Sequence, residues 1–241
     1  MKIKRLSWAG LMVESATTTI YIDPLQNVAG MKFFVDEPKF PIYPVPKPEI
    51  GKANALVTHI HQDHFDQALL GELLTDGGSL WGPEPVYSVS IKNGLQANCP
   101  KLYETFSIGD FKITAVPAVD WIGDEQFSYV ISDGKHTVYH GGDTNWHGYW
   151  WKVARQFGPF DITFLPVNGV VGSVPGVIPA SEMSGTMNPM QAVTATRILG
   201  AKPWFLCTMH SFSTHLCTSS ILILIRSSTR QEKIRKLISI D

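Results

Sequence analysis

The segment 59–64 reads HIHQDH, and it constrains this chain more than any other part because it gathers three histidines and an aspartate within six positions. It follows directly after residues 54–58, a short apolar run typical of a buried strand. One core histidine is usually a hydrogen-bonded side chain, whereas four such groups this close together would be costly to desolvate without a metal ion. Residues two apart at an extended strand end point the same way, so the first two histidines can bind one ion while the last two groups reach a neighbouring site. We therefore predict a metal centre here rather than a chance cluster.

The order of the predicted elements indicates the fold class. Apolar alternation and turn residues predict strands at 2–8, 11–15, 18–22, 54–58, 110–117, 127–132, 136–140, 160–167 and 203–208. Helices are predicted from 66 to a stop at 77–78, over 146–157, and from a capped start at 188–191 to a stop at 200. Strands followed by helices, twice over, indicate an α+β or α/β sandwich with its helices outside.

A proline-rich segment interrupts the predicted strands between residues 31 and 48. It contains five prolines and several aromatic residues. Proline removes backbone donors and excludes both a helix and a central strand. The segment is therefore either a surface loop or a lid over a pocket, and the sequence leaves both open.

The histidine segment and two later elements together resemble the metallo-β-lactamase superfamily. Residues 59–64 match its HxHxDH motif, residues 141–144 (GGDT) resemble the segment whose aspartate bridges two metals, and His210 resembles its terminal metal histidine. The resemblance covers about residues 1–212 and implies an αββα four-layer sandwich with the metals at one edge, between the sheets. The layout is most similar to the ascorbate-6-phosphate lactonase-like branch, a set of small cytosolic hydrolases that is also similar to N-acyl-phosphatidylethanolamine phospholipase D.

One position departs from the superfamily pattern. Where relatives usually have a histidine after a strand, this chain has Asp120. We predict that Asp120 binds metal; the alternative is that it only caps a turn before residues 121–123 and leaves the first ion with His59, His61 and Asp143. Two divalent ions carry about +4, and with three aspartates and a bridging hydroxide the net charge is roughly zero. A histidine at this position would leave one more positive unit, so the aspartate is expected to favour Mn²⁺ or Fe²⁺ over Zn²⁺.

The resemblance and the cluster together define a predicted site. Its metal ligands are expected to be His59, His61, Asp63, His64, Asp120, Asp143 and His210. They would hold two divalent ions (zinc or manganese, with iron as a third choice) that share a water, lower its pKa and polarise the scissile group, so that no serine or cysteine nucleophile is needed. Three residues are candidate catalytic groups: Asp63, Asp143 and His140. Three more are candidate substrate contacts: Trp121, His147 and Asn168. A packing or supporting role is an equally good interpretation of His140 and of the three candidate contacts.

These features favour one function class and keep two others open. The leading hypothesis is an enzyme, a metal-dependent hydrolase of a small ester, lactone or phosphodiester. A nuclease of the same fold ranks lower because the net charge of −1 provides no general attraction to phosphate backbones. A non-catalytic relative that binds metal or ligand is the third hypothesis, suggested by Asp120 and by an atypical tail at 213–241 without glycine, proline or aromatic residues.

The expected surroundings of the protein follow from composition. A small-molecule substrate is expected, nucleic acid is not, and no segment is apolar for long enough to span a membrane. Three widely separated cysteines make a disulfide framework improbable, which favours a reducing, cytoplasmic location. Whether the chain forms an oligomer is left open.

Overall fold

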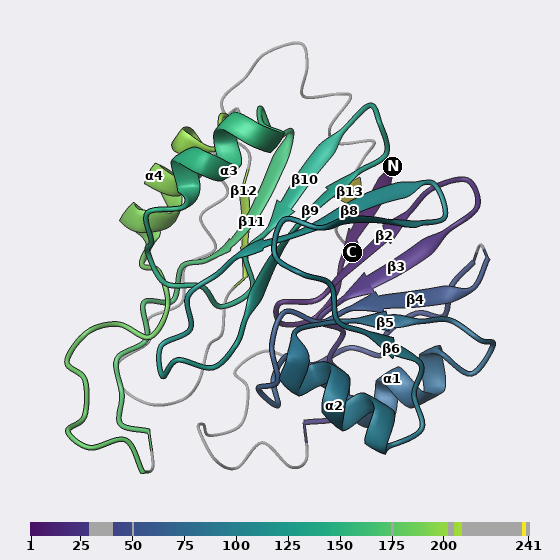
Figure 1. Ribbon diagram of the computed structural model, residues 1–241, viewed down its shortest axis with the longest axis horizontal. Coiled ribbons are helices and arrows are strands. Elements are labelled where there is room, and N and C mark those ends of the chain that lie inside the picture. The colour runs from purple at the N-terminus through teal and green to yellow at the C-terminus, as the bar shows by residue number, and fades with distance from the viewer. Residues whose placement is uncertain (29–40, 50, 175, 202–204, 209–237, 240–241) are drawn as a thin grey trace.

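Two β-sheets lie face to face and carry helices on their outer surfaces (Figure 1). The computed structural model describes residues 1–28, 41–49, 51–174, 176–201, 205–208 and 238–239. The prediction of an αββα four-layer sandwich is therefore confirmed. No helix in these ranges is long and apolar enough to cross a membrane.

The first sheet is built mainly from the N-terminal part of the chain. Its strand order is β13-β1-β2-β3-β4-β5-β6. The strands are β1 (Lys2–Arg5), β2 (Leu11–Glu14), β3 (Thr19–Ile22), β4 (Ala53–Leu56), β5 (Leu80–Trp81), β6 (Ala97–Asn98) and β13 (Ile238–Ser239). Because β3 and β4 are parallel neighbours, with Ile22 opposite Leu56, the residues that follow both strands meet at one edge of the sheet.

The second sheet comes from the later part of the chain. Its strand order is β12-β11-β10-β9-β8-β7. The strands are β7 (Thr105–Ile108), β8 (Phe111–Pro117), β9 (Phe127–Ser132), β10 (Thr137–His140), β11 (Ile162–Pro166) and β12 (Phe205–Thr208). At the edge where β4 ends, the Phe127 amide donates to the carbonyl of Thr58 at 2.9 Å and the Tyr129 hydroxyl donates to the carbonyl of Val57 at 3.0 Å. These hydrogen bonds join the two sheets beside the histidine segment.

Three apolar layers separate the elements. Side chains such as Ile20, Leu56 and Ile113 fill the space between the sheets. Outside the first sheet lie α1 (Gln67–Leu73) and α2 (Glu84–Lys92), and outside the second lie α3 (Trp150–Phe157) and α4 (Pro189–Ile198) (Figure 1). Strand β11 is buried along its whole length because the sandwich core covers one face and helices the other.

Several predicted elements are shorter in the structure, and some were not predicted. The first strand ends at Arg5 because the chain turns back there, with the Leu6 amide donating to the Gly10 carbonyl at 2.9 Å. The predicted helix at 146–157 begins at Trp150. Helix α2 escaped prediction because two prolines precede its apolar positions, although proline is tolerated in a first helical turn. The predicted capped start at Asn188 is confirmed as a reciprocal capping box with Gln191.

Two predicted features fall partly outside the described residues. Residues 41–48 of the proline-rich segment have neither helix nor strand, and Val45 is buried with its amide donating to Gln26 Oε1 at 2.7 Å. Residues 29–40 lie outside the described ranges, so the choice between a surface loop and a lid stays open. The same holds for the proposed division into a domain over 1–212 and a tail over 213–241.

Candidate metal centre

Asp23 anchors the segment that follows β4. Its carboxylate accepts from the Thr58 amide at 2.8 Å and from the Thr58 hydroxyl at 2.7 Å, and its Oδ2 lies 2.8 Å from Nδ1 of His64. Asp23 is fully buried and follows β3, the parallel neighbour of β4. One buried carboxylate therefore holds both ends of the histidine segment in place.

His59, the first residue of the histidine segment, has a ring nitrogen without a hydrogen-bond partner. Its Nδ1 lies 2.9 Å from the Thr58 hydroxyl, and that hydroxyl gives its only proton to Asp23. Nδ1 of His59 must therefore donate its proton to the Thr58 hydroxyl. The other ring nitrogen, Nε2, then carries a lone pair, and this buried atom has no hydrogen-bond partner. Burial, helped by the neighbouring imidazoles of His64 and His61, lowers the pKa of His59 to about 3. A neutral, buried and unsatisfied imidazole nitrogen is what a metal ligand requires.

Two groups of possible ligands share His59. Ring centroids place His61 4.4 Å and His64 4.2 Å from it. In each group the possible ligand atoms lie within 4.8 Å of one another; the groups are His59, His61 and Asp120, and His59, His64 and Asp143. Imidazole nitrogens and carboxylate oxygens in this arrangement fit divalent metal ions.

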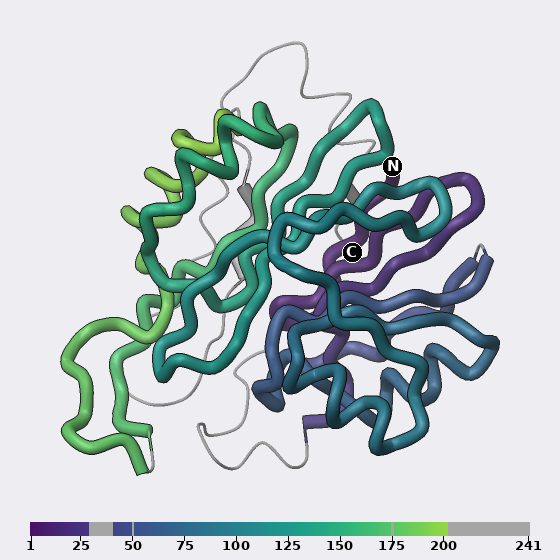
Figure 2. Tube along the Cα trace, in the orientation of Figure 1, coloured from purple at the N-terminus to yellow at the C-terminus, as the bar shows by residue number. Residues whose placement is uncertain are grey.

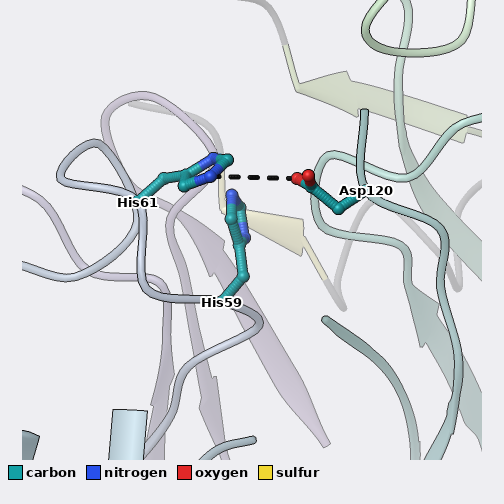
Figure 3. Close-up of side chains that lie close together, drawn as sticks. All are labelled: His59, His61 and Asp120. Carbon is teal, nitrogen blue, oxygen red and sulfur yellow. Dashed lines mark ion pairs between the residues drawn. The ribbon is translucent and has the colours of Figure 1, made fainter. Parts of the chain in front are cut away.

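Asp120 caps a turn with one carboxylate oxygen and faces the histidines with the other. Its Oδ1 accepts from the amides of Ile122, Gly123 and Asp124 at 2.8, 3.1 and 3.2 Å, so this oxygen does cap a turn. Its Oδ2 faces the histidines, 3.9 Å from Nε2 of His61 (Figure 3). The turn cap holds the side chain with its second oxygen available, and metal binding by Asp120 stays a prediction.

Asp124 was not predicted as part of the site. Its Oδ2 lies 2.9 Å from Nε2 of His61. Asp124 is 44% exposed in its side chain, whereas Asp120 is 3% exposed. The exposed carboxylate therefore lies at the rim of the site and the buried one closer to its interior.

Asp143 and Asp63 lie on the other side of the three imidazoles. Nε2 of His64 lies 3.3 Å from Asp143 Oδ2 and 3.7 Å from Asp63 Oδ2. Burial lowers the pKa of His64, but the carboxylates of Asp143, Asp63 and Asp23 outweigh it and hold that pKa well above its usual value. Without a metal, a protonated His64 balances part of the negative charge that a cation would otherwise neutralise.

Backbone geometry directs Asp143 toward the histidine segment. Gly142 has a φ of 60°, and a Cβ built there would lie 2.9 Å from Thr58 Cβ and Oγ1. Only glycine takes this conformation without strain and allows so close an approach. The loop after β10 can therefore bring Asp143 beside the segment that follows β4.

Trp8 supports Asp63 from the turn between β1 and β2. Its indole Nε1 donates to Asp63 Oδ2 at 3.1 Å, and its backbone adopts a φ of 60°. Neither Trp8 nor Asp23 was predicted from the sequence to belong to the site. The sequence shows that Asp23 ends a predicted strand. It does not show that this strand lies beside β4, and that pairing is what brings Asp23 to the histidine segment.

The structure places His140 in the scaffold of the site. It is fully buried, its Nε2 lies 3.0 Å from the Ala9 carbonyl, and its Nδ1 accepts from the Gly142 amide at 3.2 Å. Because both ring nitrogens contact backbone groups, His140 orients the loop that carries Asp143. Its predicted catalytic role is untested.

The three candidate substrate contacts also contact the protein. His147 stacks on Trp150 with ring centroids 3.9 Å apart, and its Nδ1 accepts from the Tyr149 amide at 3.2 Å. The Asn168 side-chain oxygen accepts from the Thr186 hydroxyl. The Trp121 ring lies against Gly185, where an added Cβ would come within 2.4 Å of it. Trp121 belongs to the loop that carries Asp120, His147 belongs to the loop that carries Asp143, and Asn168 follows β11. His210, the last predicted ligand, lies outside the described residues.

Comparisons with known proteins agree with this architecture. Residues 18–210 match the family described as "Beta-lactamase superfamily domain". A UPF0173 metal-dependent hydrolase of Thermococcus kodakarensis is 28% identical over 224 residues, which are 87% of this chain and 84% of the relative.

Solved structures share the fold at lower sequence identity. Igni18, a metallo hydrolase from Ignicoccus hospitalis, is 19% identical with a TM-score of 0.61, covering 86% of this chain and 81% of its own. A possible metal-dependent hydrolase from Veillonella parvula is 14% identical with a TM-score of 0.68, covering 100% of this chain and 96% of its own. These two similarities concern the fold alone.

Proposed function

The chain belongs to the beta-lactamase superfamily, it is a metal-dependent hydrolase like the relatives it matches, and we propose that it cleaves a small ester, lactone or phosphodiester. The observation that carries the proposal is the buried, unpartnered Nε2 of His59, a residue that belongs to both groups of possible metal ligands. A polar nitrogen in this state is costly unless a cation occupies the site.

The described residues suggest how two divalent ions would be held. His59, His61 and Asp120 form one proposed set, and His64 with Asp63 and Asp143 contributes to the other, which His210 would complete. Such a pair of ions, when bound, ionises water near neutral pH and polarises the scissile group. Zinc, manganese and iron all accept these ligands, with Asp120 favouring the harder ions.

The surrounding residues keep the ligands in one arrangement. Asp23 and the Thr58 hydroxyl select the tautomer of His59 that exposes Nε2. Trp8 donates to Oδ2 of Asp63 and so fixes this carboxylate beside His64, where a carboxylate could accept a proton from an attacking water. We propose that Asp63 and Asp143 are the catalytic carboxylates, and that His140 acts as a positioning residue through Gly142.

The experiment compares metal-loaded proteins on model substrates. The full chain would be stripped with a chelator, reloaded with Zn²⁺, Mn²⁺ or Fe²⁺, and assayed on p-nitrophenyl acetate, a δ-lactone and bis-p-nitrophenyl phosphate. We expect saturable, metal-dependent turnover of at least one substrate, and a loss of about 100-fold or more in His59→Ala. His136→Ala removes a histidine at the turn between β9 and β10 and serves as the matched control.

Other outcomes would favour the two remaining function classes. Tight metal binding without turnover of any substrate would indicate the non-catalytic relative. Strong competition by RNA or DNA for bis-p-nitrophenyl phosphate would indicate the nuclease. Equal activity with and without metal would refute the proposed chemistry.

A further inference from the structure

The loop between β11 and α4 exposes several large apolar side chains. The described residues of this connection, 169–174 and 176–186, are named loop 169–186, and Glu182 is the one charged residue among them. Ile178 is 92% exposed and Met183 is 75% exposed, and Val171 and Val177 are also exposed. Single exposed apolar residues are ordinary on protein surfaces, whereas several in one loop usually mark a surface that binds something apolar.

Hydrogen bonds fasten the base of this loop to the segment that carries Asp143. The Gly185 amide donates to the Val170 carbonyl at 2.6 Å and closes the neck of the loop. Asn145 Nδ2 donates to the Gly185 carbonyl at 3.0 Å, and the Met187 amide donates to the Thr144 carbonyl at 3.3 Å. Thr144 and Asn145 directly follow Asp143, so the loop is attached next to a candidate metal ligand.

The loop also contacts the segment that carries the other candidate carboxylate. The indole of Trp121, the residue after Asp120, lies against Gly185, and a Cβ built on Gly172 would lie 3.8 Å from its Cη2. Two glycines at separate points of loop 169–186 therefore lie close to this indole. Figures 1 and 2 show the loop, in light green, extending beside the connection between β8 and β9.

The contacts of Trp121 explain why Gly185 is glycine. A Cβ at position 185 would lie 2.4 Å from Trp121 Cε3 and 2.6 Å from Cδ2. Real side chains do not approach an aromatic ring so closely, and the indole would have to move. Gly185 therefore allows the loop to pack closely against the ring of Trp121, the residue that follows Asp120. The exposed apolar residues of the loop precede Gly185 in the chain.

We propose that loop 169–186 and Trp121 form an apolar arm-binding surface, so that the substrate of the metal site carries an acyl or aryl arm beside its scissile bond. This inference rests on the proposed hydrolase function, because the arm belongs to the molecule that is cleaved. Loop 169–186 adjoins both the segment that carries Asp120 and the segment that carries Asp143, so a substrate that extends past these two residues would meet it. A charged or sugar-like arm would gain little from this surface, whereas an apolar arm would remove these side chains from water.

The experiment is a chain-length series on metal-loaded protein. Hydrolysis of p-nitrophenyl acetate, butyrate, hexanoate and octanoate would be followed below the solubility limit of each ester. A methylene that is fully removed from water changes a binding constant by about fourfold. With partial coverage, we expect kcat/KM to be about tenfold or more higher for octanoate than for acetate.

The decisive variant changes two exposed residues. Ile178→Ser/Met183→Ser should reduce the octanoate-to-acetate ratio toward one, because the loss of the apolar surface lowers octanoate hydrolysis more than acetate hydrolysis. Ile91→Ser/Leu102→Ser replaces two apolar residues that are each 47% exposed, on α2 and before β7, and should keep the parent ratio. The same ratio in the parent and in the loop variant would overturn the inference.

A failure of the proposed function is distinguishable from a failure of this inference. If the metal-loaded protein hydrolyses no ester, binding of octanoate and acetate would be compared by isothermal titration calorimetry. Octanoate binding that is stronger than acetate binding in the parent, and weakened in Ile178→Ser/Met183→Ser, would support the apolar surface without ester hydrolysis. Equal affinities for the two acids would overturn it.

Discussion

His147 makes the fold sensitive to acid, and this sensitivity can be removed by substitution. The side chain is 7% exposed and stacks on Trp150, and its Nε2 is a buried atom without a hydrogen-bond partner. Burial lowers its pKa to about 4, whereas a histidine in the unfolded chain titrates near 6.5. Below pH 6.5 the unfolded chain therefore binds a proton that the folded protein does not, and acid favours unfolding.

The size of the effect follows from the two pKa values. Between pH 7 and pH 5 the linkage relation gives a loss of about 2 kcal/mol in the free energy of unfolding from this one group. The loss continues toward pH 4 and levels off below the folded-state pKa. Stability from this source is thus fully present above the unfolded value and declines as pH falls through the interval from about 6.5 to about 4.

Two substitutions separate the effect of protonating His147 on stability from the effect of its packing. His147→Asn keeps an acceptor near the Tyr149 amide but loses the stacked ring, and His147→Phe keeps the ring but loses the acceptor. Their absolute stabilities should differ. Both should nevertheless lose about 2 kcal/mol less than the parent on going from pH 7 to pH 5.

The assay is urea unfolding of chelator-treated protein, followed by tryptophan fluorescence at pH 7, 6 and 5. Chelation removes metal binding as a second source of pH dependence. If both variants lose as much stability as the parent between pH 7 and pH 5, the assignment of acid sensitivity to a neutral, buried His147 is refuted. A change in the denaturant slope would show that a variant altered the unfolded state instead.

Three further predictions concern the metal centre. Asp23→Asn should weaken metal binding about 10- to 100-fold while the ligands stay in place, measured by competition with a chromophoric chelator; an unchanged affinity would contradict its orienting role. Gly142→Ala should lower the free energy of unfolding by about 1–3 kcal/mol and reduce metal content, because a Cβ would collide with Thr58 at a φ of 60°, whereas Gly148→Ala has open space and should not. Asp120→His should raise the ratio of zinc to manganese retained after purification, measured by elemental analysis, and identical metal content in both proteins would remove the charge argument.

Local patterns in the chain were enough to predict much of the fold. The capped start at Asn188 needs only residues three apart, and the strand before the histidine segment needs only a short apolar run. Such patterns depend on neighbours along the chain, so they are legible without knowing the tertiary structure. Helix α2 was missed because its prolines resemble those of a loop, although the same residues fit a first helical turn.

The amino-acid sequence by itself determined the kind of chemistry, because the composition and spacing of residues 59–64 demand a cation whatever surrounds them. Only the tertiary structure shows which side chains lie where such a cation would bind and which hold those side chains in place. Asp23 and Trp8 join the site through hydrogen bonds that span 41 and 55 positions, and the ring nitrogens of His140 contact backbone groups. The direction in which a polar side chain points at a strand end depends on which strand lies next to it, and that pairing is a property of the folded sheets.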